Sequence, residues 1–433
     1  MKRTAVSELL FWKNKKDRKP LIVRGARQVG KTWLMKSFAE SEYENYVYIN
    51  FENKPYLQLF LQDFNIERIL TAIYAETGIR PIPGKTLIIL DEIQEDPKAL
   101  TSLKYFYENA PEYHIVAAGS FLGIALHQGT SFPVGKVDFL DLYPLSFFEF
   151  LSALGESEFL KFLQEKEWDL VKTFKSKYID WLKLYYYIGG MPEVVSKFIE
   201  NQDFEEVRKI QNHILETYEN DFSKHAPPEV VPRIRMVWNA IPAQLARENK
   251  KFIYGSLKSG ARAKDFEMAI EWLLDCGLIH KINRVEKPGM PLKAYEDFSA
   301  FKLFLNDVGL MSAMAGLDIK VIVNSESGFS EFKGALTEQF VLQQLVFAGN
   351  FYIYYWSAEK SDGEIDFLVQ YKNKIIPIEV KAAENLQAKS LRAFVQKYDQ
   401  KQAVRTSLSD YREEDWLTNV PLYAIGSLGK IVE

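Results

Sequence analysis

The sequence that decides the fold is Gly25-Ala26-Arg27-Gln28-Val29-Gly30-Lys31-Thr32. The apolar run 21–23 before it predicts a strand, and residues 33–39 after it predict a helix. In this strand–loop–helix context, the spacing G-x-x-x-x-G-K-[ST] predicts a loop whose backbone N–H groups surround a phosphate. The N-terminus of the helix adds partial positive charge. The sequence therefore predicts a binding site for a nucleoside triphosphate.

Two residues of this loop and two further along the chain have predicted roles in that site. We expect Lys31 to reach the β- and γ-phosphates and the Thr32 hydroxyl to ligate Mg²⁺. The apolar run 87–90 predicts a buried strand that ends in Asp91 and Glu92. Asp91 is expected to hold Mg²⁺ through water, and Glu92 to polarise the attacking water.

A third apolar run, 115–118, predicts another short buried strand, with Gly119 and Ser120 at its end. Two interpretations of Ser120 stay open. Its hydroxyl could sense the γ-phosphate, or it could be a serine in an ordinary tight turn. No Asn/Thr-Lys-x-Asp motif that reads guanine is apparent, so ATP is favoured over GTP.

Composition limits the classes of protein that this chain can belong to. The 433 residues predict two to four domains with ample core, and 47% hydrophobic with 26% charged residues is ordinary for a globular protein. A net charge of −4 gives no overall basic field for non-specific binding to nucleic acid. The single cysteine, Cys276, excludes an intrachain disulfide. No apolar run approaches the ~18 residues of a membrane span, and no signal peptide is apparent, so we expect a cytoplasmic protein without a membrane partner.

The hydrophobic patterns predict a multidomain α/β protein. Alternating strand and helix patterns over residues 1–150 predict a parallel sheet with helices on both faces, which is the nucleotide-binding core. Residues 151–228 are helical and aromatic-rich, and are interpreted as a lid subdomain. Residues 229–325 predict two helices and two strands, laid out like a winged helix. Residues 326–433 form the last predicted domain.

The winged-helix-like connector is open to two interpretations. Its second predicted helix, residues 261–275, carries Arg262 and Lys264 but also four acidic residues, which are Asp265, Glu267, Glu271 and Asp275. So acidic a helix is poorly suited to a groove lined with phosphates. A structural spacer is therefore favoured over a DNA reader.

The C-terminal domain contains a second candidate site. If the hairpin of residues 363–381 turns at residues 372–373, Asp366 faces Glu379 across the ladder, and Lys381 shares a face with Glu379. Two opposed carboxylates are destabilising unless positive charge lies between them. Such a set, with Glu338 from an upstream helix as a third carboxylate, could hold a second divalent metal. Alternatively, Lys381 is simply the counter-ion of a self-neutralised cluster.

These C-terminal residues resemble the core of the restriction-endonuclease-like nucleases, in which D…(E/D)-x-K lies on a hairpin after an acidic helix. The resemblance covers about the last hundred residues. It implies the α/β fold of that class for residues 326–433. It leaves two alternatives, an active nuclease or a domain that binds nucleic acid or protein without cutting.

The whole chain resembles a family of bacterial and archaeal AAA-like ATPases that carry a C-terminal domain of unknown function. The motifs that carry this resemblance are residues 90–94, 118–120, 142–147 and 189–193, together with the C-terminal hairpin. The resemblance implies ATP binding with Mg²⁺. One feature departs from it, because no arginine occurs between Arg80 and Arg208 to serve as an arginine finger. Lys136 lies in that region, but a lysine lacks the planar fork of a guanidinium. Arg233 and Arg235, from the later domain, are alternative donors, and slow turnover is expected.

The leading hypothesis from the sequence is a nucleotide-driven switch. ATP and Mg²⁺ would close the lid over the loop and reposition the C-terminal domain, which requires different affinities for the two states. One alternative is an ATP-dependent DNA or RNA nuclease with Asp366, Glu379 and Lys381 as its cutting centre. Another is a non-catalytic scaffold that ATP locks for a protein partner. A nucleic acid, a protein or a second copy of the chain remain open as partners.

Overall fold

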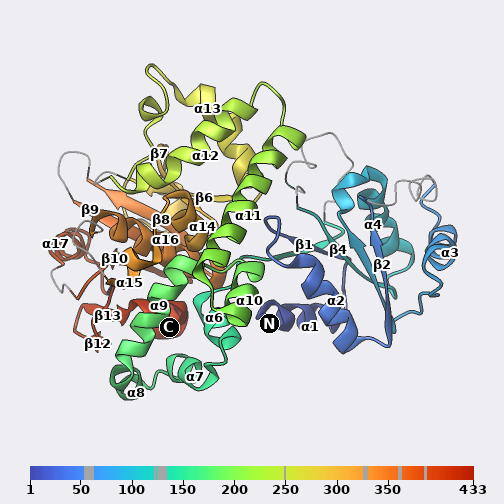
Figure 1. The fold of residues 1–433 in the computed structure, drawn as a ribbon, viewed down its shortest axis with the longest axis horizontal. Helices are drawn as coiled ribbons and strands as arrows, with labels where there is room; N and C mark the ends of the chain where they lie inside the picture. The colour runs from blue at the N-terminus through green and yellow to red at the C-terminus, as the bar shows by residue number, and fades with distance from the viewer. Residues whose placement is uncertain are drawn as a thin grey trace. The chain divides into compact units, whose positions relative to one another are not determined.

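The computed structural model describes residues 1–52, 63–120, 123, 133, 135–247, 250–324, 330–358, 363–384 and 388–433 (Figure 1). Two compact units account for the chain. The N-terminal unit comprises residues 2–143 and 275–278, and the C-terminal unit comprises residue 1, 144–274 and 279–433. Within the described residues, no helix combines the length and the apolar character needed to cross a membrane.

The N-terminal unit is built on a parallel five-stranded sheet in the order β2-β3-β4-β1-β5. Its strands are β1 (Leu21–Arg24), β2 (Asn45–Asn50), β3 (Thr86–Asp91), β4 (His114–Ala118) and β5 (Asp138–Asp141). Every residue of β3 and β4 is buried, as expected for central strands covered on both faces. The described α-helices up to residue 143 are α1 (Ala5–Lys13), α2 (Lys31–Glu42), α3 (Ile66–Thr77) and α4 (Pro97–Asn109). This confirms the parallel α/β sheet predicted from the sequence.

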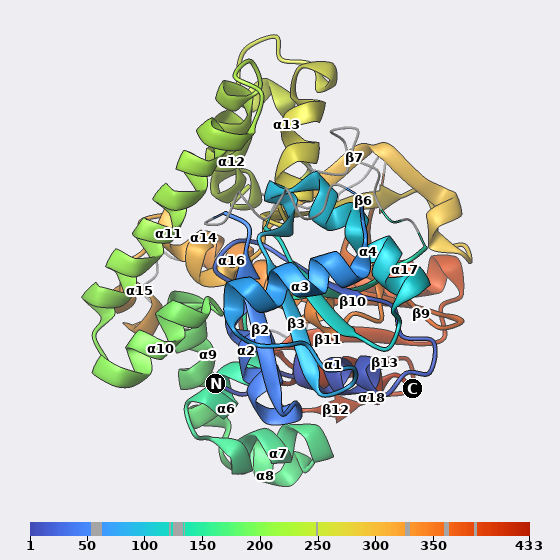
Figure 2. The same cartoon turned by 90° about the vertical axis from the view of Figure 1, so that its right-hand side faces the viewer.

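The sheet order brings the predicted motifs to one edge. β1 lies between β4 and β5, and β3 follows β4, so the loop after β1 and the ends of β3 and β4 are neighbours. Because all these strands are parallel, their carboxyl ends lie at the same edge of the sheet. Figure 2 shows β2 and β3 side by side, with α2 and α3 near them.

The C-terminal unit begins with helices and ends in a mixed sheet. Its described α-helices are α6 (Phe147–Ala153), α7 (Ser157–Glu165), α8 (Trp168–Thr173), α9 (Lys175–Ile188), α10 (Pro192–Asn201), α11 (Phe204–His225), α12 (Val231–Leu245), α13 (Ala263–Asp275, whose last residue is grouped with the other unit), α14 (Val308–Met314), α15 (Ile319–Asn324), α16 (Ser330–Ala348), α17 (Lys389–Tyr398) and α18 (Leu428–Ile431). The run of helices from α6 to α11 covers the region interpreted as a lid.

One sheet of eight strands, in the order β12-β13-β11-β10-β9-β8-β6-β7, runs through this unit. Its strands are β6 (Ile279–Val285), β7 (Glu296–Leu305), β8 (Tyr352–Ser357), β9 (Glu364–Tyr371), β10 (Lys374–Val380), β11 (Ala403–Ser407), β12 (Arg412–Glu413) and β13 (Leu417–Pro421). The predicted connector supplies the hairpin β6–β7, and β6 pairs with β8 of the last predicted domain. The four-domain division remains a prediction, and these two parts share a sheet.

A buried carboxylate joins three parts of the C-terminal unit. Asp307 is fully buried, and its Oδ2 accepts hydrogen bonds from the Gly190 backbone N–H at 2.6 Å and from Gln343 Nε2 at 3.2 Å. Its Oδ1 accepts from the Leu310 N–H at 3.0 Å. Burial raises the pKa of Asp307, and these hydrogen bonds oppose that effect. Gly190 also packs against Leu145, because a Cβ added to Gly190 would lie 2.1 Å from the Leu145 carbonyl oxygen.

We predict that Asp307→Ala destabilises the protein by about 3 kcal/mol or more, because it leaves several buried donors without an acceptor. Asp307→Asn should cost less, since its Oδ1 still accepts. The urea midpoint measures both effects, and Asp180→Ala, at an exposed position of α9, is the control. An Asp307→Ala midpoint equal to that of the control would show that the carboxylate does not hold these elements together.

Candidate functional site

The predicted phosphate-binding loop joins β1 to α2. Gly25 has φ +148°, and a Cβ at this position would lie 2.1 Å from the Leu142 carbonyl oxygen. Only glycine is compatible with this close approach and this backbone conformation. Gly30, with φ +93°, is the N-cap of α2, which begins at Lys31. The loop therefore leads directly into a helix N-terminus, the arrangement that favours an anion.

Lys31 is buried within the loop and has three hydrogen-bond acceptors. Its Nζ donates to the carbonyl oxygens of Gly25 at 3.0 Å and Ala26 at 2.8 Å, and to Ser120 Oγ at 3.0 Å. An ammonium group has three donors, so this set satisfies it. Burial lowers the pKa of Lys31 to about 8, although the nearby carboxylates of Glu92 and Asp91 oppose the shift.

The Thr32 hydroxyl and the Asp91 carboxylate, the two groups assigned to Mg²⁺ from the sequence, contact each other. Thr32 Oγ1 donates to Asp91 Oδ2 at 2.6 Å, and Asp91 is 2% exposed at the end of β3. The hydroxyl of Tyr48, on β2, donates to the same Oδ2 at 2.9 Å. Burial and Asp91 raise the pKa of Tyr48 to about 12, so its hydroxyl stays a donor at neutral pH.

The residue after Asp91 has an unusual backbone conformation. Glu92 has φ +50° and ψ +43°, the left-handed region that few non-glycine residues adopt. Its carboxylate accepts a hydrogen bond from Gln94 Nε2 at 2.7 Å. Strained positions of this kind concentrate at functional sites. The structure thus places Glu92 directly beyond Asp91 and holds its side chain by Gln94.

Two residues of this site were not predicted from the sequence. Arg3, which is 6% exposed, donates to the Val29 carbonyl oxygen at 3.0 Å and to the Tyr143 carbonyl oxygen at 2.6 Å. It therefore fastens the loop to the segment after β5. Tyr48 is the second. Arg3 precedes the loop by more than twenty residues, and no local spacing connects it to the motif. The alternation of side chains along β2 places Tyr46 and Tyr48 on the same face. It does not indicate which of the two tyrosines reaches Asp91.

The lysine considered as a substitute for an arginine finger has a partner of its own. Lys136 Nζ lies 3.1 Å from Glu108 Oε1, and both side chains are about a third exposed. Exposed pairs of this kind contribute little to stability and exchange readily. The role of Lys136 therefore stays a prediction.

The C-terminal candidate residues assemble at the open end of the β9–β10 hairpin. The ladder pairs Tyr371 with Lys374 and Phe367 with Ile378, the register predicted from the sequence. Continued by one residue, it places Asp366 opposite Glu379. Asp366 Oδ2 accepts from the Val380 N–H at 2.7 Å, and Lys381 Nζ lies 2.7 Å from Glu379 Oε1.

The structure adds two lysines that the sequence did not predict, Lys302, which is buried, and Lys250, which is partly exposed. Lys250 forms an ion pair with Glu338 on α16, and Lys302 on β7 forms one with Glu364 on β9. Lys302 Nζ also lies 3.9 Å from Glu338 Oε2. Burial lowers the pKa of Lys302, but Glu364, Glu338 and Asp366 together outweigh it and raise that pKa to about 12. Burial and Asp366 raise the pKa of Glu338, against the effect of the two lysines.

This cluster does not fit a divalent cation as it is arranged. Glu338, Glu364 and Glu379 are each paired with a lysine, and Asp366 accepts a backbone hydrogen bond. Across the part of the chain that the structure describes, no group of three or more His, Cys, Asp or Glu side chains is placed to hold a metal ion. The arrangement agrees with the self-neutralised cluster considered from the sequence.

Comparison with protein families divides the chain into three segments. Residues 17–151 match the AAA domain family, residues 179–320 match a domain of unknown function, DUF8612, and residues 333–425 match another, DUF4143. The first match covers the loop, Asp91 and Ser120. The match of residues 17–151 to an AAA domain supports ATP binding. In a comparison with curated proteins, none matches this chain.

Several solved structures align with the chain at low identity. The Walker-type ATPase PAby2304 of Pyrococcus abyssi aligns over 72% of this chain and 95% of its own, at 14% identity and a TM-score of 0.43. The Orc1 protein of Aeropyrum pernix, in complex with DNA, aligns over 72% and 90%, at 12% identity and a TM-score of 0.28. AMPPCP-bound DnaA from Aquifex aeolicus aligns over 62% and 85%, at 14% identity and a TM-score of 0.27.

We predict that nucleotide affinity falls by up to tenfold per pH unit above about pH 8, because phosphate binding favours the charged form of Lys31. The contribution of Lys31 to stability changes with pH in the opposite direction. Between pH 8 and 10.5 the folded chain binds fewer protons at Lys31 than the unfolded chain, so this residue's contribution to the unfolding free energy rises with pH. Calorimetric titration with a non-hydrolysable ATP analogue measures the affinity. Lys31→Arg, if it binds, should flatten the dependence; an equal slope in that variant would contradict the assignment.

We also predict that Lys302→Met destabilises the protein by about 3–5 kcal/mol, because it leaves Glu364 without its buried cation and removes one of the two lysines beside Glu338. Adding Glu364→Gln should recover part of the loss, which a double-mutant cycle measures. Lys293→Met, at an exposed position, is the control. Additive effects of the two substitutions would show that Lys302 and Glu364 do not interact.

Proposed function

We propose that this protein is an ATP-binding, slow Mg²⁺-dependent ATPase that acts as a nucleotide-driven switch. The observation that carries the proposal is the meeting of Lys31, Thr32, Asp91 and Ser120 at the carboxyl edge of a parallel sheet. A loop that cradles phosphate and a buried carboxylate beside its hydroxyl are the two halves of a nucleotide-hydrolysing site.

The residues present fit Mg²⁺. Thr32 Oγ1 and Asp91 Oδ2 are oxygen donors 2.6 Å apart, and Mg²⁺ prefers oxygen ligands with several waters retained. When bound, the ion would neutralise charge on the β- and γ-phosphates. Tyr48 holds Asp91 by a second hydrogen bond, which fixes the orientation of the carboxylate.

In hydrolysis, we assign the remaining residues as follows. Lys31 exchanges its contacts with Gly25, Ala26 and Ser120 for phosphate oxygens, and the freed Ser120 hydroxyl is then available to the γ-phosphate. Glu92 orients the attacking water and accepts a proton from it. Turnover is slow because the chain has no arginine between residues 80 and 208 to stabilise the transition state.

The division of the chain into two compact units supports a switch rather than hydrolysis alone. In this proposal, the nucleotide favours one arrangement of the lid helices and of the C-terminal domain over another. The C-terminal domain is proposed to have a restriction-endonuclease-like fold, supported by the order of its elements. Acidic helix α16 precedes the β9–β10 hairpin that carries Asp366 and Glu379.

Nuclease activity is the alternative function, supported by the convergence of Asp366, Glu379 and Lys381 at one end of the hairpin. The ion pairs of the cluster weigh against it and favour a domain that regulates or binds without cutting. A scaffold that ATP locks for a protein partner is the other alternative. It differs from the switch in lacking hydrolysis and in acting on a protein partner rather than on the C-terminal domain.

We predict that Lys31→Ala abolishes ATP binding, because it removes the cation of the loop. Glu92→Gln should keep binding but lower kcat at least a hundredfold, the typical effect of losing a general base. Binding is measured with a fluorescent ATP analogue and hydrolysis by phosphate release. Glu112→Gln, at an exposed turn of the same unit, is the control. Hydrolysis retained in Lys31→Ala would overturn the site assignment.

The same assay, with and without DNA or RNA, separates the alternatives. For the switch, we expect no cleavage products, whether or not nucleic acid stimulates hydrolysis. Mg²⁺- or Mn²⁺-dependent cleavage that Asp366→Ala abolishes would establish the nuclease instead. ATP binding without hydrolysis in the wild type would favour the scaffold.

A further inference from the structure

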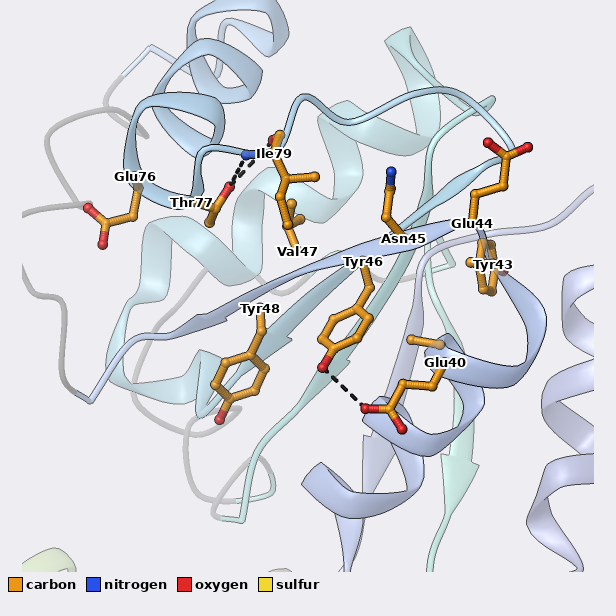
Figure 3. Close-up of a pocket in the computed structure, with 11 residues that line it drawn as sticks. Glu40, Tyr43, Glu44, Asn45, Tyr46, Val47, Tyr48, Glu76, Thr77 and Ile79 are labelled. Carbon is orange, nitrogen blue, oxygen red and sulfur yellow. Dashed lines mark hydrogen bonds between the residues drawn. The ribbon is translucent and has the colours of Figure 1, made fainter.

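A groove of about 700 Å³ runs along the outer edge of the N-terminal unit's sheet (Figure 3). Its walls come from three elements: the end of α2, strand β2 with the two residues before it, and the end of α3. The lining residues used below are Glu40, Glu44, Tyr46, Val47, Tyr48 and Glu76. Figure 3 shows Tyr46 and Tyr48 on the side of Glu40, and Val47 on the opposite side, near Thr77 and Ile79.

The groove follows an edge strand. In the described part of the chain, β2 has a strand neighbour, β3, on one side only. An edge strand presents a row of unpaired backbone N–H and C=O groups, which another extended segment can pair with. Alternate side chains of β2 point to opposite sides, so an added strand would contact tyrosine rings on one side and Val47 on the other.

The charge of the groove selects the chemistry of its occupant. Three carboxylates line it, from Glu40, Glu44 and Glu76, and no lysine or arginine is among its described lining residues. Glu40 accepts a long hydrogen bond of 3.4 Å from the Tyr46 hydroxyl, and Glu44 pairs with Lys85 at 2.7 Å. More than half of each side chain in the latter pair is exposed, so the pair is weak and exchangeable. Such a lining repels a phosphate backbone and attracts cationic side chains.

We propose that this groove binds an extended, lysine- or arginine-rich segment of a partner protein, which adds to the sheet beside β2. Backbone hydrogen bonds to β2 supply affinity, and the three carboxylates select basic side chains. The six residues of β2 match a segment of about six residues, or roughly 20 Å of strand.

The groove is connected to the nucleotide site through one residue. The Tyr48 ring lines the groove, and its hydroxyl donates to Asp91 Oδ2, which Thr32 also contacts. Lys36 of α2 lies 3.7 Å from the centre of the same ring. A peptide that moves Tyr48 thus acts on the carboxylate assigned to Mg²⁺. This coupling, unlike the peptide site itself, rests on the proposed function.

The test is fluorescence anisotropy with a labelled nine-residue peptide of alternating valine and lysine. Two comparison peptides are a valine–glutamate version and a version with N-methylated backbone that cannot pair as a strand. We expect only the valine–lysine peptide to bind. The double variant Glu40→Lys/Glu76→Lys should lower its affinity at least tenfold. Glu112→Lys, an exposed charge reversal outside the groove, should leave the affinity unchanged.

Several outcomes would overturn the proposal. One is no binding of the valine–lysine peptide up to about 1 mM. The others are that the N-methylated peptide binds as tightly as the unmodified one, or that Glu112→Lys lowers the affinity as much as the double variant does. Sedimentation of the wild type and the double variant tests the other occupant. Self-association that the double variant abolishes, without peptide binding, would assign the groove to a second copy of the chain.

The coupling has its own readout. An ATP analogue with Mg²⁺ should change the peptide affinity several-fold in the wild type. Tyr48→Phe, which keeps the ring and loses the hydroxyl bonded to Asp91, should make the peptide affinity the same with and without nucleotide. An unchanged nucleotide effect in Tyr48→Phe would overturn the coupling. If the wild type fails to bind ATP, the proposed function fails, but peptide binding to the nucleotide-free protein still tests the groove.

Discussion

The arrangement of the C-terminal unit depends on the buried carboxylate of Asp307. One side chain accepts hydrogen bonds from the segment between α9 and α10, from α14 and from α16, which lie far apart in the sequence. Further glutamines of α16 extend this pattern, since Gln339 bonds both backbone groups of Leu305 and Gln344 accepts from the Phe147 N–H. Buried polar groups have to be satisfied inside the protein, so these bonds define how the helices and the sheet fit together.

The sequence predicted the nucleotide site where its chemistry depends on local spacing. The glycines, Lys31 and Thr32 are adjacent in the chain, and Asp91 ends an apolar run that was interpreted as a buried strand and forms β3. Parallel strands then bring Ser120 to the same edge. Arg3 and Tyr48 could not be predicted, because their roles arise from a contact between two strands of the sheet and from a contact between the residues before α1 and the loop. Neither residue type signals such a contact by itself.

In the C-terminal cluster, too, contacts between residues far apart in the chain could not be predicted from local spacing. The hairpin register of Asp366 and Glu379 followed from the turn and from the period of two. The two lysines of the cluster could not be predicted in this way. Lys250 precedes α13 and Lys302 lies on β7, and each is more than sixty residues before the hairpin. A lysine in an apolar strand such as β7 is an informative signal, because it is rarely buried without a carboxylate partner. Which carboxylate it would meet depends on the pairing of β6 with β8.

The long separation of these contacts has a consequence for synthesis on the ribosome. The bond between Phe147 and Gln344 spans 197 residues, and the bond between Gly190 and Asp307 spans 117. At typical elongation rates, the helices that follow residue 144 emerge roughly 10 to 40 s before α16, which completes their packing. The surfaces of α6 and α9 that pack on α16, where Phe147 and Tyr185 contact Phe340, stay uncovered for that interval. The C-terminal unit thus keeps apolar surface uncovered late in synthesis, whereas β1 to β5 of the N-terminal unit have already been made.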